Sequence, residues 1–150
     1  MSAARALALA AFLAFGAAGS AALAAAPDRP IALTLDHRPV ATNPDVALVH
    51  DGIVYVDIVP LTRAFQGSLH RTATTATARI TDYVGRFTLG STTLHLAHGT
   101  FTMAGPPFVR NGKFYVPLNA YVVKFARQRM FVNLSQTKAN IFVNSDPEDF

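Results

Sequence analysis

The chain has 150 residues, with 13 lysines and arginines, 9 aspartates and glutamates, and no cysteine. The lack of cysteine excludes disulfides, thiolate metal sites and cysteine nucleophiles. The net charge of +4 comes from basic residues spread along the chain rather than gathered in one motif, so we predict no nucleic-acid partner.

Residues 1–24 have the composition of a secretory signal peptide. Arg5 precedes a long run of alanine and leucine, and Ala22-Leu23-Ala24 fits a small-x-small cleavage site. The alternative is an uncleaved membrane anchor, since the run is about long enough to span a bilayer, but glycines interrupt it and small residues end it. We therefore expect cleavage near Ala24 and an exported product that is extracellular, cell-wall associated or periplasmic, with no stable membrane span.

Residues 27–146 are expected to form one domain, which opens with strands. The alternation of apolar with small or polar residues in 31–35 predicts a half-buried strand. The apolar segments 46–49 and 53–56 then flank Asp51-Gly52, a pair typical of a tight hairpin turn.

A short helix is predicted after this hairpin. Asp57 is placed to cap its start, and Ile58, Leu61 and Phe65 have the i, i+3, i+7 spacing of one helical face. Gly67 is the expected end of the helix, because glycine accepts the left-handed conformation that terminates many helices. Further strands and hairpins are expected up to Met103.

A second unit of the same kind begins near Val109. Asn111-Gly112 predicts a type I′ hairpin turn, and Pro117 can open a helix because a first helical residue needs no N–H partner. Strands are expected at 129–134 and 139–143, and residues 147–150 should fray. The apolar face of this second helix consists of Leu118, Tyr121, Val122 and Phe125.

The two units repeat at a distance of 60 residues (111 − 51). The shared offset through turn, strand and helix predicts an internal duplication, with repeats of about 31–82 and 86–143. The predicted fold class is α+β, with twisted antiparallel sheets packed around two short helices, from duplication of a strand-turn-strand-helix-strand unit. The residues expected to define this fold and its core are Val49, Gly52, Ile58, Phe65, Val109, Gly112, Leu118 and Phe125.

The segments ALVHDGIVYVDI and PPFVRNGKFYVPL resemble the copper amine oxidase N-terminal-like domain, also called the stalk domain, over about residues 31–144. The resemblance implies an α+β module of bacterial surface and secreted proteins, which in amine oxidases is remote from the chemistry. It implies no copper or other cofactor, because the three-histidine copper site and the quinone belong to a separate catalytic domain. The chain departs from the family at Asp57, where proline is usual, and at Ala126-Arg127-Gln128, where a glycine normally ends the helix.

No catalytic or metal-binding motif stands out. His95 and His98 would share a face on a helix, but on the predicted strand residues i and i+3 point to opposite sides. No serine has the flanking glycines of a nucleophile elbow, and the single glutamate, Glu148, lies in the tail. We therefore predict no catalytic residue, no metal site and no cofactor.

Tyr55 and Tyr115 occupy equivalent positions in the two repeats. If both face solvent beside Arg110 and Lys113, the four side chains form a stacking surface for sugar rings or for a partner strand. The alternative is that the tyrosines belong to the core, as such aromatic residues more often do.

The export signal, the duplicated unit and the lack of catalytic motifs favour a secreted, non-catalytic module of the bacterial envelope that contacts cell-wall polysaccharide or an envelope protein. One alternative is a small hydrolase of wall or peptide substrates with a His-Asp site. That site requires a buried cleft holding an aspartate and two or more of His50, His70, His95 and His98. Another alternative is an extracellular inhibitor or partner that offers a sheet edge for strand addition.

Overall fold

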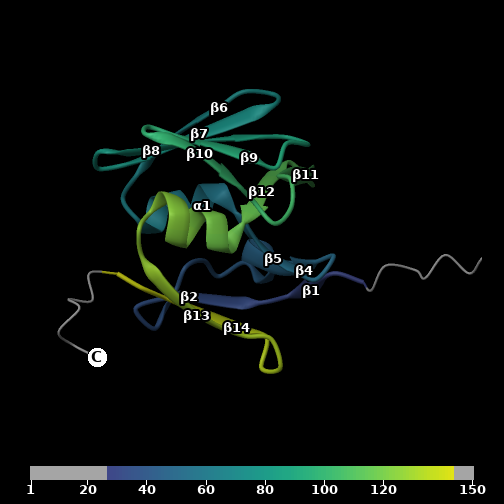
Figure 1. The fold of residues 1–150 in the computed structure, drawn as a ribbon. Helices are drawn as coiled ribbons and strands as arrows, with labels where there is room; N and C mark the ends of the chain where they lie inside the picture. The colour runs from purple at the N-terminus through teal and green to yellow at the C-terminus, as the bar shows by residue number, and fades with distance from the viewer. Residues whose placement is uncertain (1–26, 144–150) are drawn as a thin grey trace, which may run out of the picture.

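The structure, a computed structural model, describes residues 27–143; the predicted signal peptide (1–24) and frayed tail (147–150) lie outside the described residues. In the described part, three sheets surround two helices longer than one turn (Figure 1). Most strand pairings are antiparallel, so the predicted α+β class with twisted antiparallel sheets is confirmed. No helix within 27–143 is long and apolar enough to cross a membrane.

The hairpins of both repeats share one sheet, which we call the repeat sheet, of strand order β1-β4-β5-β12-β11. The positive φ predicted for a type I′ turn at Asn111-Gly112 is confirmed, with values of 52° and 74°, and Asp51-Gly52 shows the same pattern with 49° and 76°. A Cβ on either glycine would meet no atom within 4 Å, so backbone conformation alone explains these glycines. The strands are β1 (Arg29–Pro30), β4 (Ala47–His50), β5 (Ile53–Asp57), β11 (Phe108–Arg110) and β12 (Lys113–Pro117).

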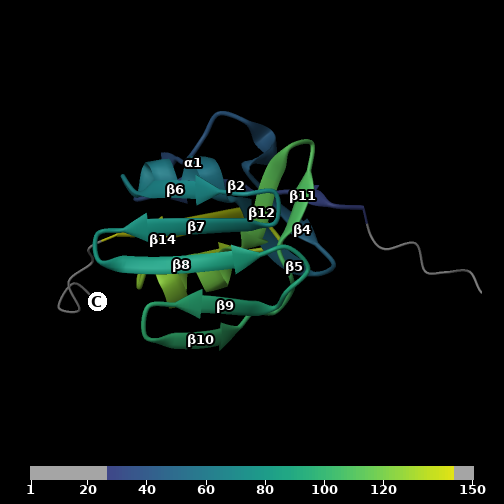
Figure 2. The same cartoon turned by 90° about the horizontal axis from the view of Figure 1, so that it is seen from above.

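The meander sheet lies over the helices when the molecule is viewed from above (Figure 2). Its strand order is β10-β9-β8-β7-β6, and neighbouring strands follow one another in the chain. Each pairing is therefore antiparallel, as consecutive hairpins require. The strands are β6 (Ser68–Arg71), β7 (Thr75–Ile80), β8 (Tyr83–Thr88), β9 (Thr93–Leu96) and β10 (Gly99–Thr102).

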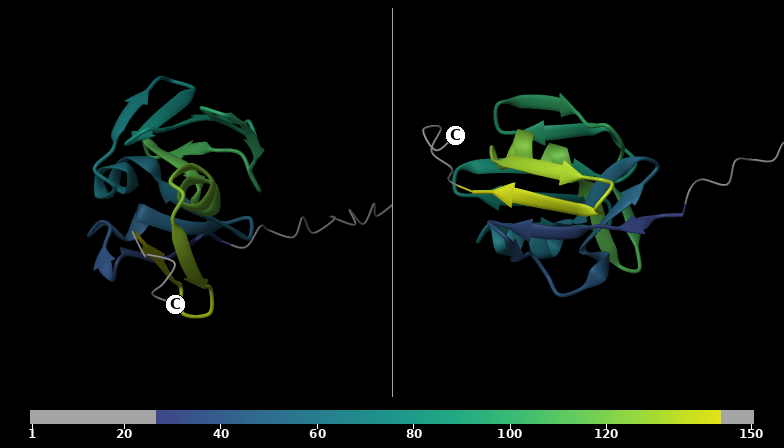
Figure 3. Two further views of the ribbon diagram at one scale, coloured as in Figure 1. Left: turned by 60° about the vertical axis from the view of Figure 1, so that its left-hand side comes forward. Right: turned by 90° about the horizontal axis from the view of Figure 1, so that it is seen from below.

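The terminal sheet joins the first and last parts of the described chain in the order β13-β14-β2-β3. It lies on the opposite side of the helices and faces the viewer in the view from below (Figure 3, right). The pairing of β14 with β2 is parallel, which differs from the antiparallel pattern predicted. The two strands come from distant parts of the chain, so no hairpin constrains their direction. The strands are β2 (Ala32–Leu35), β3 (Arg38–Pro39), β13 (Arg129–Asn133) and β14 (Lys138–Phe142).

Helix α1 (Ile58–Ala64) begins at the predicted cap, where the Asp57 carboxylate accepts a hydrogen bond from the Val59 N–H at 3.2 Å. Burial is the main influence on the pKa of Asp57 and raises it. The prediction for the end of the helix is wrong, because Gln66 rather than Gly67 is left-handed, with φ of 58°. Gly67 instead permits close packing, since a Cβ there would lie 2.6 Å from the Arg79 carbonyl oxygen.

The second helix, η2 (Ala120–Phe125), is a π-helix that follows β12, and its predicted apolar face is buried. The Ala126 N–H donates to the Tyr121 carbonyl oxygen at 2.8 Å, which is the i→i−5 bond of this helix type. Arg127 then takes a φ of 59° close to the place where the family usually has glycine. The end of η2 is therefore irregular at the segment where this chain lacks the glycine that is usual in the family. A short 3₁₀-helix, η1 (Pro44–Val46), precedes β4.

One hydrophobic core contains residues of both repeats. Phe65 and Phe125 both pack against Tyr121, with ring centroids 6.1 Å and 5.0 Å from its ring. Thr62 of α1 and Tyr121 of η2 share a buried hydrogen bond, with their hydroxyl oxygens 2.7 Å apart. Burial raises the pKa of Tyr121, and this hydrogen bond lowers it by less. Both repeats therefore contribute to this main core, and a second, smaller cluster contains Tyr55 of one repeat and Tyr115 of the other.

Most of the residues that were predicted to define the core are buried in it. Val49, Ile58, Leu118 and Phe125 are buried, and Phe65 is partly buried against the same cluster. The prediction for Val109 is wrong, because its side chain is 43% exposed. It belongs to β11, an edge strand of the repeat sheet, whose outer side is open to solvent.

Candidate ligand-binding face

The candidate site is the outer side of the terminal sheet. Side chains alternate along β14, so Ala139 and Ile141 are buried while Lys138, Asn140 and Phe142 point outward. Lys138 and Asn140 each lie opposite an outward residue on both neighbouring strands, so these residues form rows across the sheet. In the strand order β13, β14, β2, the rows are Phe131–Asn140–Thr34 and Asn133–Lys138–Ala32.

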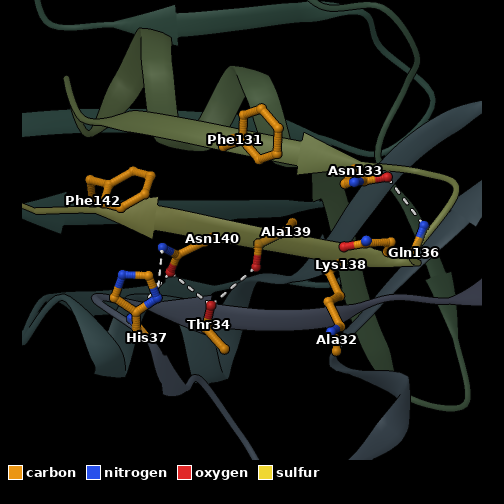
Figure 4. A pocket seen from close by; sticks show the side chains of 10 residues that line it. All are labelled: Ala32, Thr34, His37, Phe131, Asn133, Gln136, Lys138, Ala139, Asn140 and Phe142. Atoms are coloured by element: carbon orange, nitrogen blue, oxygen red, sulfur yellow. Dashed lines mark hydrogen bonds between the residues drawn. The ribbon is translucent and has the colours of Figure 1, made fainter.

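These rows line an open hollow of about 430 Å³. Figure 4 shows side chains from β2, β13, β14 and their turns around this hollow, including two phenylalanine rings and three carboxamides. We call this surface the terminal-sheet face. Its residues are Ala32, Thr34, His37, Phe131, Asn133, Gln136, Lys138, Ala139, Asn140 and Phe142.

Two carboxamides of the terminal-sheet face are held in place by hydrogen bonds to their oxygens. The Asn140 Oδ1 accepts from the Thr34 hydroxyl at 2.7 Å and from the His37 N–H at 3.2 Å. The Asn133 Oδ1 accepts from the Ser135 hydroxyl at 2.7 Å and from the Gln136 N–H at 3.1 Å. Since an amide oxygen has two lone pairs, these side chains offer a ligand mainly their N–H groups.

The aromatic residues of the face present apolar surface beside these polar groups. Phe131 is 64% exposed, the largest exposed fraction among the exposed large hydrophobic side chains of the described chain. Phe142 is partly buried and contacts the His37 ring, with centroids 5.9 Å apart and an interplanar angle of 78°. Exposed aromatic surface rimmed by polar groups is typical of an interaction site.

The predicted stacking surface at Tyr55 and Tyr115 is not formed, because both side chains are only 2% exposed. Their rings pack against Phe108, with centroids 4.8 Å and 5.2 Å away. Their hydroxyls donate to the Pro106 carbonyl oxygen at 3.0 Å and to the Asp45 carbonyl oxygen at 2.8 Å. Burial is the main cause that raises the pKa of both tyrosines.

The predicted cations of that surface are paired with carboxylates. Arg110 forms an ion pair with Asp28, and the Lys113 ammonium lies 3.8 Å from the Asp45 carboxylate. Asp28 also contacts His50 Nδ1 at 2.8 Å. Burial raises the pKa of Asp28, but the hydrogen bonds and charges of Arg110 and His50 together outweigh burial and hold the net pKa below its ordinary value. This cluster ties the start of the described chain to the repeat sheet.

The hydrolase alternative requires two histidines beside an aspartate in a buried cleft, and the described residues do not form one. His50 alone has aspartate partners, Asp28 and, at 3.3 Å, Asp51. The other three histidines of that hypothesis are exposed, with His70 in β6, His95 in β9 and His98 in the turn that follows β9. Within 27–143, no three His, Asp or Glu side chains gather closely enough to hold a metal ion.

The terminal-sheet face was not among the predicted site residues, although its strands were predicted. The alternation of Arg129, Phe131 and Asn133, and of the residues that pair with them, marks one side of each strand. That signal could have identified a common surface. It could not show whether the surface faces the core or solvent, because both sides of these strands carry apolar residues.

The profile of the copper amine oxidase N-terminal domain matches residues 34–138. Comparisons with curated proteins and with solved structures found no match. The matched range includes both hairpin turns, both helices and most of the terminal-sheet face. The chain therefore belongs to the copper amine oxidase N-terminal domain family, and the domain that defines this family is non-catalytic in amine oxidases.

Proposed function

We propose that this protein is a secreted, non-catalytic module of the cell envelope that binds wall glycan through the terminal-sheet face. The observation that supports binding at this place is Phe131, which is 64% exposed and stands at the outer end of the row that continues through Asn140 and Thr34. Membership of a non-catalytic domain family supports a binding role rather than a chemical one. The secretory composition of residues 1–24 supports export.

A sugar ring matches the chemistry of this face. It has an apolar C–H side that can stack on an aromatic ring and hydroxyl groups around its edge. Covering Phe131 would remove apolar area from water, which is worth about 1.5–3 kcal/mol for a fully buried side chain of this size. The oriented carboxamides of Asn133 and Asn140 are in position to donate to hydroxyl oxygens at the ring edge.

Retention of the purified protein on insoluble peptidoglycan tests this proposal. Phe131→Ala should reduce the retained fraction, with an apparent affinity about tenfold lower, since the loss of an aromatic contact costs on the order of 1.5 kcal/mol. Tyr83→Ala is the matched control, because Tyr83 is 44% exposed but belongs to β8 in the meander sheet. Failure of the unmodified protein to bind peptidoglycan would contradict the proposal.

A second candidate function is strand addition by a partner protein at β13. With five residues, β13 is the longest of the edge strands of the described sheets, and it contains no proline. Phe131 within it and Leu134 beside it are both exposed. An exposed edge of this kind is a template for an added strand. Retention on an envelope fraction that disappears after protease treatment, without retention on pure peptidoglycan, would favour this candidate over the first.

A further inference from the structure

We infer that the glycan bound by the terminal-sheet face is acidic and carries carboxylate groups. This inference rests on the proposed function and names the chemical class of its ligand. The face has an excess of hydrogen-bond donors, one lysine and no acidic side chain. A neutral sugar would leave the lysine without a counter-charge, whereas a carboxylate-bearing sugar would provide one.

The first step concerns Lys138, which lies in the row between Asn133 and Ala32. Within the described part of the chain, no hydrogen bond or ion pair engages its ammonium group. Arg110 and Lys113, in contrast, each have an aspartate partner. Lys138 is therefore a cation that borders an acid-free hollow and is open to pairing with a ligand.

The second step concerns the donors next to this cation. The carbonyl oxygens of Asn133 and Asn140 each already accept two hydrogen bonds from the protein. Both side chains can therefore offer a ligand the N–H groups of their amides. The Asn140 Nδ2 also lies 3.5 Å from His37 Nδ1. Carboxylate oxygens accept hydrogen bonds but do not donate them, so they complement such a surface.

The third step concerns the layout of charge along the face. Arg129 pairs in register with Phe142, which places it on the same side of the sheet as Phe131. The basic residues thus stand at the two ends, with Lys138 at one and Arg129 at the other, about 13 Å apart along β14 at roughly 3.3 Å per residue. A polymer that lies along the strands from Lys138 would meet the lysine and then the Phe131 ring before it reaches Arg129, which also has an interaction within the protein.

The Asp36 carboxylate lies towards the end of the terminal sheet away from Lys138, because Leu35 before it pairs with Ile141 whereas Lys138 pairs with Ala32. Asp36 follows β2 at the edge of the terminal sheet but does not line the hollow. Its carboxylate already accepts the Val143 N–H at 3.0 Å, a bond that holds it beside the end of β14. Lys138 and Asp36 therefore lie at opposite ends of the paired strands β14 and β2.

Isothermal titration with two matched probes tests the inference. One probe is a hexamer of β-linked mannuronate, and the other is the same hexamer after chemical reduction of its carboxylates to neutral hydroxymethyl groups. We expect the acidic probe to bind about tenfold more tightly at low salt, and this preference to shrink as salt rises, because salt screens exposed charges. Lys138→Gln should weaken binding of the acidic probe about threefold to fivefold and leave binding of the neutral probe unchanged.

Lys124→Gln is the matched control, since Lys124 lies over the Phe101 ring and outside the face, and it should change neither affinity. Equal binding of both probes, or a Lys138→Gln protein with unchanged preference, would overturn the inference while leaving the proposed function intact. Retention on peptidoglycan without binding of the acidic hexamer would also overturn it. Absence of all glycan binding, peptidoglycan included, would overturn the proposed function itself.

Discussion

Val56 of β5 and Val116 of β12 lie directly opposite each other in the antiparallel repeat sheet. They are also equivalent positions of the two repeats, 60 residues apart (116 − 56). The pairing of β5 with β12 therefore has local twofold symmetry, and its axis lies between Val56 and Val116. The two neighbouring pairs are Tyr55 with Pro117 and Asp57 with Tyr115. The twofold axis converts one of these pairs into the other, because Tyr55 is equivalent to Tyr115 and Asp57 to Pro117. The two repeats are thus joined in the sheet through equivalent strands, β5 and β12.

Both valines are fully buried, so truncating either should destabilise the fold by a similar amount. We expect Val56→Ala and Val116→Ala each to lower the free energy of unfolding by about 1–3 kcal/mol, through lost burial and a residual cavity. Urea denaturation measures both values. Val109→Ala, at an exposed edge position, should change stability by less than about 0.5 kcal/mol. A cost at one buried valine but none at the other would contradict the symmetric arrangement.

The buried hydrogen bond between Thr62 and Tyr121 should appear as coupling between α1 and η2. Thr62→Val and Tyr121→Phe each leave the other hydroxyl buried without this partner, which costs about 1–3 kcal/mol. The double variant removes both polar groups, so it should be more stable than the sum of the single effects predicts. A thermodynamic cycle from urea denaturation measures this coupling, and strictly additive effects would show that the contact contributes nothing specific.

Adjacent residues at the end of α1 should respond in opposite ways to substitution. Gly67→Ala places a Cβ 2.6 Å from the Arg79 carbonyl oxygen and should cost about 1–3 kcal/mol. Gln66→Gly relieves a left-handed residue with φ of 58°, so it should be neutral or stabilising by up to about 1 kcal/mol. Thermal unfolding of both variants compares the two effects. A stabilising Gly67→Ala would show that α1 does not pack against β7 in this way.

The ion pairs of Asp28 should make the free energy of unfolding depend on pH below neutrality. Because its net folded pKa lies below the ordinary value of 3.8, Asp28 stabilises the fold above that pH, and this contribution is lost as pH falls through the folded pKa. Asp28→Asn should therefore be less stable than the unmodified protein at neutral pH, by under about 1 kcal/mol because the Arg110 side chain is 40% exposed and solvent screens the pair. The difference should narrow below about pH 3.8.

Urea denaturation of both proteins at neutral pH and in acid measures this difference. Asp57 has a shift of opposite sign, since burial raises its pKa, but it is present in both proteins and cancels in the comparison. Asp82→Asn is the control for the loss of an aspartate, because Asp82 is exposed in the turn before β8. An Asp28→Asn effect that persists undiminished in strong acid would mean that the ion pairs are not its cause.

Local features of this protein could be predicted because they depend on residues close together in the chain. Asn111-Gly112 specifies its turn because both residues tolerate positive φ. Asp57 caps α1 because its carboxylate reaches a backbone N–H two residues away. The end of α1 could not be assigned correctly, since the reason for Gly67 is a contact with Arg79 of β7, and that contact exists only once the strand has folded against the helix.

The sequence by itself determined the two hairpins, the start and apolar face of each helix, and the family. The tertiary structure alone decided which aromatic residues reach solvent. Tyr115 and Phe131 both lie in predicted strands, yet Tyr115 is covered by Phe108 while Phe131 lies on the open side of an edge strand. Alternation along a strand distinguishes its two sides, but only the packing of sheets and helices determines which side is covered.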